Sequence, residues 1–128
     1  MAHLESNIFA LLTTAPTATA FVGARVYPKV LPPKTRLPAL TFERVSGNYD
    51  ADLEGESGAA NPRIQVSCWA LGYEQAKDLA KAVRKAMNAA TEAANGFTAL
   101  TLSDGDLYEE AQNYHCVWVD FSTWHEED

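Results

Sequence analysis

Apolar residues near the N-terminus recur at helical spacing. Four of them share one face of a helix: Leu4, Ile8, Leu11 and Leu12. Pro16 disfavours helical backbone at the residue before it, so the pattern predicts a helix that ends near this position. Residues 17–23 are expected to form a short second helical turn that ends at Gly23.

A longer helical pattern runs from Tyr73 to about Ala94. Its apolar stripe consists mostly of small residues: Ala76, Leu79, Ala80, Val83, Ala86, Met87 and Ala90. The opposite face is basic and carries Lys77, Lys81, Arg84 and Lys85. Residues 95–96, an Asn-Gly pair, are a typical helix stop. We therefore predict one long amphipathic helix, whose small apolar residues allow it to lie close against a sheet.

Polar and apolar residues alternate in the middle of the chain, which predicts strands. The alternation is clear over residues 39–45 and 63–70. Residues 25–28 are short and extended, and Pro28 restricts them to the edge of a sheet or the end of a strand. Residues 46–62, between the two longer strands, are polar and contain several glycines, which predicts a long loop.

The C-terminal third predicts a meander of strands. Residues 97–103 form the first strand, and the Asp-Gly pair at residues 104–105 is a strong signal for a two-residue hairpin turn. The next strand, residues 106–110, leads through a turn into a long aromatic strand over residues 114–124. Large apolar groups lie on both faces of this last strand, which suits a strand central to the sheet or one that faces a partner subunit.

These elements predict an α+β domain with a mostly antiparallel β-sheet packed by one long amphipathic helix, an N-terminal helix and a long polar loop. A chain of 128 residues suits a single domain, residues 1–128. No apolar run approaches the ~20 residues that cross a bilayer, and the first residues lack the basic start of a signal peptide. We expect a soluble, intracellular protein without a membrane partner.

Charge is distributed unevenly along the chain. The formal net charge is −7, yet all ten Lys and Arg lie within residues 1–85, and residues 86–128 contain only acidic charges. A protein that reads nucleic-acid sequence needs clustered cations to neutralise phosphates, so this class of function is disfavoured.

The long loop carries four carboxylates and no base: Asp50, Asp52, Glu54 and Glu56. The first three fall at positions 1, 3 and 5 of an EF-hand loop, but position 12, which requires a bidentate Glu, is Asn61. Calcium binding is therefore disfavoured. The loop suits either a segment that binds a partner or a surface loop without a role.

Cysteine and histidine, the residues best suited to nucleophilic catalysis, form no recognisable pair. His115 and Cys116 are adjacent on a predicted strand, so their side chains point to opposite faces. Cys68 would meet His115 only across neighbouring strands, and a buried cysteine usually acts as a small apolar residue. Spacings typical of zinc ligands or of phosphate-binding loops are absent. We predict no enzyme, no metal site and no cofactor.

The ordered set of segments resembles one known family, the tail completion or tail terminator proteins of long-tailed bacteriophages and prophages. The pieces that carry the resemblance are IFALL at 8–12, FVGARVYP at 21–28, LPALTF at 37–42, RVSG at 44–47, RIQVSCWA at 63–70, YEQA at 73–76, DLYE at 106–109, VDF at 119–121 and WH at 124–125. The resemblance covers nearly the whole chain and rests on the order of the pieces, including the step from strand to helix over residues 69–76.

The resemblance implies a structural, non-enzymatic role. Proteins of this family form a ring, commonly of six subunits, on the head-proximal end of the tail tube. The ring stops polymerisation of the major tail protein and provides the surface for head-completion or connector proteins, while double-stranded DNA passes through its lumen without specific binding. The implied location is the neck region of the virion tail, after assembly in the cytoplasm of the host bacterium.

A closed ring joins its subunits head to tail, so each subunit needs two different complementary patches. The basic helix face and the acidic C-terminal third are a plausible pair, although a solvated, charged outer face is the usual state of a surface helix. With the acidic loop and one face of the last strand, the candidate interface residues are Asp50, Asp52, Glu54, Glu56, Lys77, Lys81, Arg84, Lys85, Trp118, Asp120 and Trp124.

Two alternatives to the terminator remain open. One is another ring-forming part of the same machinery, such as a head–tail connector or a tube-like protein. The other is a small intracellular enzyme or binding domain whose site the sequence does not reveal, which a deep pocket with perturbed titratable groups would favour.

Overall fold

The chain forms helices and strands in nearly the order that the sequence predicts, except that Glu92–Asn95 is an additional turn and the single strand Thr98–Glu109 replaces two predicted strands. The computed structural model describes residues 3–49 and 59–126. Its elements are α1 (Leu4–Thr14), α2 (Pro16–Val22), β1 (Val26–Pro28), β2 (Ala39–Tyr49), β3 (Ala59–Ala70), α3 (Tyr73–Asn88), α4 (Glu92–Asn95), β4 (Thr98–Glu109) and β5 (Tyr114–Glu126). This arrangement confirms the predicted α+β class.

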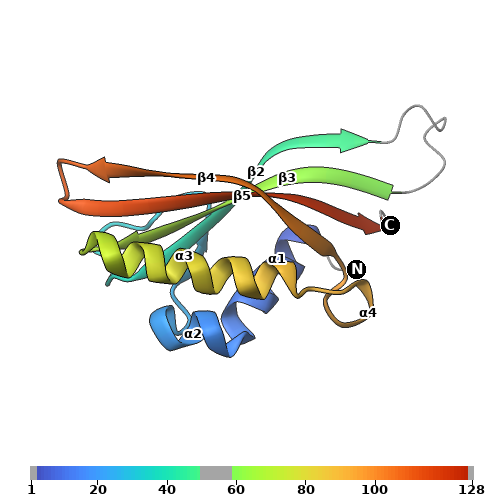
Figure 1. Ribbon diagram of the computed structural model, residues 1–128, viewed down its shortest axis with the longest axis horizontal. Coiled ribbons are helices and arrows are strands. Elements are labelled where there is room, and N and C mark those ends of the chain that lie inside the picture. The colour runs from blue at the N-terminus through green and yellow to red at the C-terminus, as the bar shows by residue number, and fades with distance from the viewer. Residues whose placement is uncertain (1–2, 50–58, 127–128) are drawn as a thin grey trace.

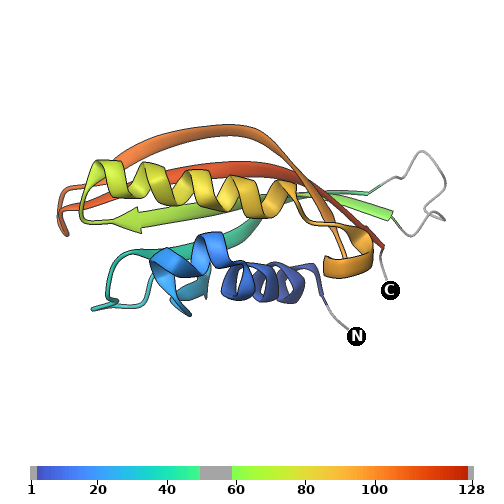
Figure 2. The same ribbon diagram turned by 60° about the horizontal axis from the view of Figure 1, so that its bottom comes forward.

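The five strands form one sheet in the order β1-β2-β3-β5-β4. β1 pairs with β2 in parallel, whereas the other three pairs are antiparallel. β5 lies between β3 and β4, so the aromatic strand is an inner strand of the sheet, next to the edge strand β4. α1, α2 and α3 all cover the same face of the sheet (Figure 1), with α3 over one half of it and α1 and α2 over the other half (Figure 2).

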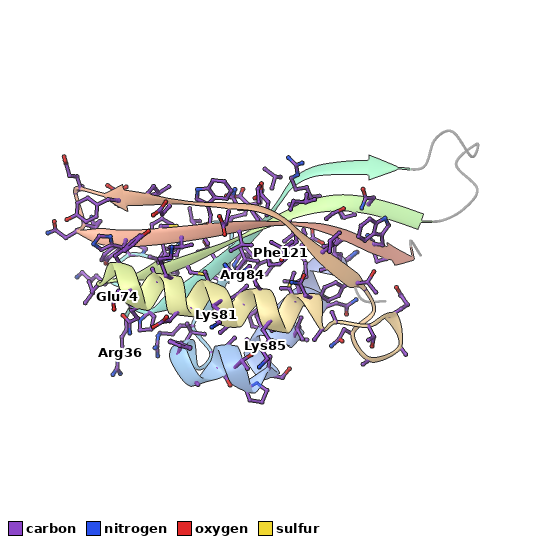
Figure 3. The ribbon with its side chains drawn as sticks, in the orientation of Figure 1. Arg36, Glu74, Lys81, Arg84, Lys85 and Phe121 are labelled. Atoms are coloured by element: carbon purple, nitrogen blue, oxygen red, sulfur yellow. The ribbon has the colours of Figure 1, made fainter. Side chains whose placement is uncertain are left out.

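The core lies between this helical layer and the sheet. All seven residues of the predicted α3 stripe are buried, as are Val119 and Phe121 of β5. Phe121 lies between the sheet and α3 (Figure 3). From α1, Leu4, Ile8 and Leu12 complete the cluster. Burying a large apolar side chain contributes about 1.5–3 kcal/mol, so the two predicted stripes account for much of the driving force for folding.

The long helix ends earlier than the sequence pattern predicts. α3 stops at Asn88, and the separate turn α4 begins after Thr91. The Thr91 side chain accepts a hydrogen bond from the Ala94 backbone N–H, and the Asn95 side chain accepts one from the Thr91 backbone N–H. Gly96, with φ +82°, ends α4 rather than the long helix. The predicted extent to Ala94 was wrong because this local capping starts a new turn.

The predicted loop over residues 46–62 is wrong at both of its ends. β2 extends to Tyr49, and β3 begins at Ala59, so residues on either side pair as antiparallel strands. Asn61 donates hydrogen bonds to the Ser122 hydroxyl and to the Thr123 carbonyl of β5, which stabilises this extension. Asp50, Asp52, Glu54 and Glu56 lie outside the described residues.

The predicted hairpin at residues 104–105 is also wrong. β4 continues through these residues, with an irregularity between Thr101 and Ser103, and the turn into β5 follows Glu109. Gly105 lies opposite Trp118, and a Cβ atom on Gly105 would collide with the Trp118 ring. The glycine is therefore required for the close approach of the indole and not for a turn.

Replacing Gly105 with alanine is expected to destabilise the fold by about 1–3 kcal/mol, because the added methyl group collides with the Trp118 ring. Urea unfolding measures this loss. In a Trp118→Ala background the same substitution should have a much smaller effect. An equal loss of stability in both backgrounds would show that the ring is not the cause.

Candidate functional site

Exposed apolar side chains lie along β4, and one lies at the end of β5 that pairs with the start of β4. They are Leu100, Leu102, Leu107, Tyr108 and Trp124. Val119 and Phe121 of β5 point toward the helices, so the residues that alternate with them along β5 point to the opposite face. Trp124 is one of these residues, and Leu100 and Leu107 share its face because they pair with two others, Ser122 and Cys116. Leu100 and Trp124 lie at one end of this face, and Leu107 lies at the other end, opposite Cys116. Exposed apolar side chains on an uncovered sheet face suit burial against another protein.

The β5 residues predicted as interface members share this open face. Trp118 lies over Gly105 of β4. The Asp120 carboxylate accepts a hydrogen bond of 3.0 Å from the Gln65 amide on β3. Trp124 is 43% exposed. The structure thus brings the three together on one strand face, with Trp118 and Asp120 supported by neighbouring strands and Trp124 open to contact.

The basic face of α3 divides into two parts. Arg84 points toward the sheet and forms an ion pair of 3.7 Å with Asp104 of β4, and the Lys77 amine lies 5.5 Å from the centre of the Tyr73 ring. Lys81 and Lys85 are exposed on the side of α3 that faces away from the sheet (Figure 3). The basic face of α3 and the acidic C-terminal third of the chain therefore already contact each other within one chain, through Arg84 and Asp104. Lys81 and Lys85 face outward from the chain.

α3 is also attached to β4 through a reciprocal pair of polar contacts. The Asn88 amide donates a hydrogen bond of 3.0 Å to the Thr101 hydroxyl, and its oxygen accepts one of 3.2 Å from the Thr101 backbone N–H. Asn88 therefore holds the end of the helix against β4 and occupies one backbone donor of that strand.

Neither cysteine has the environment of a nucleophile. Cys68 is opposite Val117 and His115 is opposite Ala70, while the His115 ring lies 4.8 Å from the Tyr108 ring and 5.9 Å from the Tyr73 ring. Burial raises the pKa of Cys68 well above its ordinary value, and burial raises the pKa of Cys116 to about 11. Both thiols are therefore protonated at neutral pH.

Metal-binding and membrane-spanning features are missing from the part of the chain that the structure describes. No group of His, Cys, Asp or Glu side chains within residues 3–49 and 59–126 could hold a metal ion. None of the helices described there is long and apolar enough to cross a membrane.

The sequence does not predict the cleft that lies beside residues 29–34. It has a volume of about 460 Å³ and lies between residues 29–34 and the adjoining ends of β3, β4 and β5, with Trp69 and Tyr114 among its walls. Lys29 and Lys34 adopt positive φ angles of 66° and 62°, an uncommon conformation for side chains of this kind. Only the Pro32–Pro33 pair marks this segment in the sequence, and it predicts a connection without indicating that the connection folds against strands from the other end of the chain.

Comparison with known proteins shows a family and a solved structure to which most of this chain is similar. A family model described as tail completion protein gp17 matches residues 6–126. A chain in the solved structure titled "Virion of native gene transfer agent (GTA) particle" has the same fold, with a TM-score of 0.73 and 19% sequence identity over 93% of this chain and 91% of that chain. No protein of curated function matches the sequence.

The thiols are expected to resist modification in the folded protein. A thiol reagent at pH 8 should leave Cys68 and Cys116 unmodified, because both are buried and their raised pKa values keep them protonated. After denaturation both should react within minutes. The fraction of Cys116 present as thiolate should rise only as the pH approaches about 11. Rapid modification of the native protein at pH 8 would contradict the inert environment.

Proposed function

The chain belongs to the tail completion protein gp17 family and is a structural protein of a phage tail, and from this premise we propose that it forms a closed ring on the head-proximal end of the tail tube. The ring stops polymerisation of the tube and offers its other side to the head-completion or connector proteins. The observation that carries this proposal is the family match over residues 6–126. A place in the neck of the virion and assembly in the host cytoplasm follow from the same proposal.

The surface of the chain supports an assembly role. Its helices cover one face of the sheet only, and the other face carries exposed apolar side chains on β4 and β5. Such a surface is suited to burial against another protein. The two cysteines are buried, and burial raises the pKa of each thiol, so both are protonated at neutral pH.

We assign Lys81 and Lys85 to contacts with neighbouring proteins in the tail. Both are exposed on the outer side of α3, whereas Arg84 is engaged with Asp104. Surface cations guide association with acidic surfaces and discriminate between partners. The acidic segment with Asp50, Asp52, Glu54 and Glu56 is assigned to contact with the major tail protein, because it is joined to the outer ends of β2 and β3.

DNA passes through the proposed ring without being held. Each subunit has a formal charge of −7, so a ring of six copies repels phosphates at short range. Salt screens this repulsion beyond about 8 Å under physiological conditions. The DNA therefore slides through the lumen and makes no sequence-specific contacts.

A second candidate is a tube-like or connector ring of the same machinery. Both candidates use a head-to-tail ring, but a tube protein stacks its rings without limit, whereas a terminator binds one end and stops. Filaments formed by the purified chain would favour the tube-like protein.

Reversing the charge of Lys81 and Lys85 to Glu is expected to impair tube capping, because acidic partner surfaces would then be repelled. Electron microscopy of tube lengths, with the chain added to polymerising major tail protein, measures the effect. The Lys81→Arg, Lys85→Arg protein keeps the charges and should cap normally. If the reversed protein caps as well as the wild type, the α3 face is not a partner surface.

Neutralising the acidic segment tests its contact with the tube. A protein with Asp50→Asn, Asp52→Asn, Glu54→Gln and Glu56→Gln should remain folded by circular dichroism, yet fail to shorten tubes in the same assay. Two exposed helical acids, changed by Glu74→Gln and Glu92→Gln, serve as the control for the lost charge. Normal capping by the neutralised protein would refute the assignment.

A further inference from the structure

β4 is a long strand whose outer edge is available for pairing. It has 12 residues, none of them buried, and it lies at the end of the sheet. It also carries the exposed side chains of Leu100, Leu102 and Leu107. Natural proteins usually shorten, charge or cover such an edge, because its unpaired backbone groups and apolar side chains recruit further strands. The charges of β4 lie in its second half, and residues 98–103 are uncharged. Asn88 covers β4 at one position, the Thr101 N–H.

The opposite end of the sheet has a second open edge. β1 has only three residues and pairs with residues 40–42 of β2. β2 continues to Tyr49, and its register pairs residues 43–49 with β3 on one side only. Within the described residues, no strand lies on the outer side of this part of β2.

Strand direction makes the two edges compatible. β2, β3, β5 and β4 are neighbours in that order, and each neighbouring pair is antiparallel, so β2 and β4 run in opposite directions. Two copies placed side by side with their sheets continuous would set β4 of one antiparallel to β2 of the next. The added pairing has the same geometry as the rest of the sheet.

Charge distinguishes the two edges and favours the contact. β4 carries the exposed acids Asp104, Asp106 and Glu109. The segment that joins β1 to β2 carries three exposed cations, which are Lys29, Lys34 and Arg36.

Three groups near these edges also have partners inside the chain. Asp104 is paired with Arg84, Glu109 accepts a hydrogen bond from the Ala111 N–H, and Arg44 of β2 lies 3.7 Å from Glu5. Glu43 is the acid of the β2 edge. The balance is nevertheless acidic on one edge and basic beside the other.

We propose that the outer edge of β4 in one copy pairs antiparallel with residues 43–49 of β2 in a second copy, so that β-sheet hydrogen bonding joins the subunits of the ring. The inference rests on the proposed ring and names its junction. The contact is head to tail, since β4 and β2 are different surfaces, and a contact of this type closes into a ring when the rotation between copies allows it. It also places the exposed leucines of β4 beside the next strand of the continued sheet.

Amide hydrogen exchange tests the junction without assuming a register. In the assembled protein, peptides from residues 98–109 and 43–49 should exchange at least about tenfold more slowly than in the diluted monomer, because strand pairing protects their outer N–H groups. The peptide from residues 4–14 should not change. Assembly that leaves the β4 peptides unprotected would overturn the junction and leave the ring itself standing.

A matched pair of lysine variants gives an independent test. Leu102→Lys with Leu107→Lys places charges on the proposed junction and should weaken self-association by at least about tenfold, as measured by native mass spectrometry over a concentration series. Leu71→Lys changes a leucine that is 66% exposed outside β4 and should associate within about twofold of the wild type. Circular dichroism establishes that each monomer is folded. Equal association of both variants would refute the proposal.

Failure of the junction is distinguishable from failure of the proposed function. A wild-type chain that stays monomeric at every concentration overturns the junction, since free edges of this kind should pair when concentrated. The tube-capping assay decides the function separately, because capping requires action at the tube end and not self-association in solution.

Discussion

Burial of the α3 stripe against β3 and β5 is the constraint on which the rest of the structure depends. The helix lies close to the sheet because its stripe, which includes Ala76, Ala80 and Val83, consists mostly of small residues. Val119 and Phe121 of β5 face this stripe. Closely packed protein interiors tolerate few changes in side-chain volume. Because α1 and α2 cover the remaining half of the same face, the helices satisfy one side of the sheet and leave the other side and its edges exposed.

This one-sided cover connects the fold to the function. The helices leave one face of the sheet uncovered, and Leu100, Leu107 and Trp124 are exposed there. In the proposed assembly such residues would become buried, and the free energy of their burial would favour association. The same reasoning applies to the β4 edge, whose outer backbone groups would gain partners in the proposed junction.

Charged side chains distinguish the surfaces of the chain from one another. The ion pair between Arg84 and Asp104 is partly exposed, so its contribution to stability is at most about 1 kcal/mol. It pairs Arg84 with an acid of the same chain, whereas Lys81 and Lys85 of the same helix remain exposed to other proteins. The acidic β4 edge and the basic β1–β2 connection then remain as complementary surfaces, which orient partners more than they add affinity.

Local patterns in the sequence determined the α+β class, the stripes of α1 and α3, and the strands over residues 39–45, 63–70 and 114–124, because helical and strand periodicities depend on neighbouring residues. The resemblance to tail completion proteins was likewise present in the order of these segments, and the family match bears it out. Tertiary structure alone decided what depends on distant partners. Gly105 lies within a strand because Trp118 of β5 packs on it, and Asn61 lies in β3 because it bonds to β5. Arg84 turns inward because Asp104 is near, and residues 29–34 form a cleft wall because β3 and β5 end beside them. Each of these contacts joins residues far apart in the chain, so the pattern of neighbouring residues does not predict it.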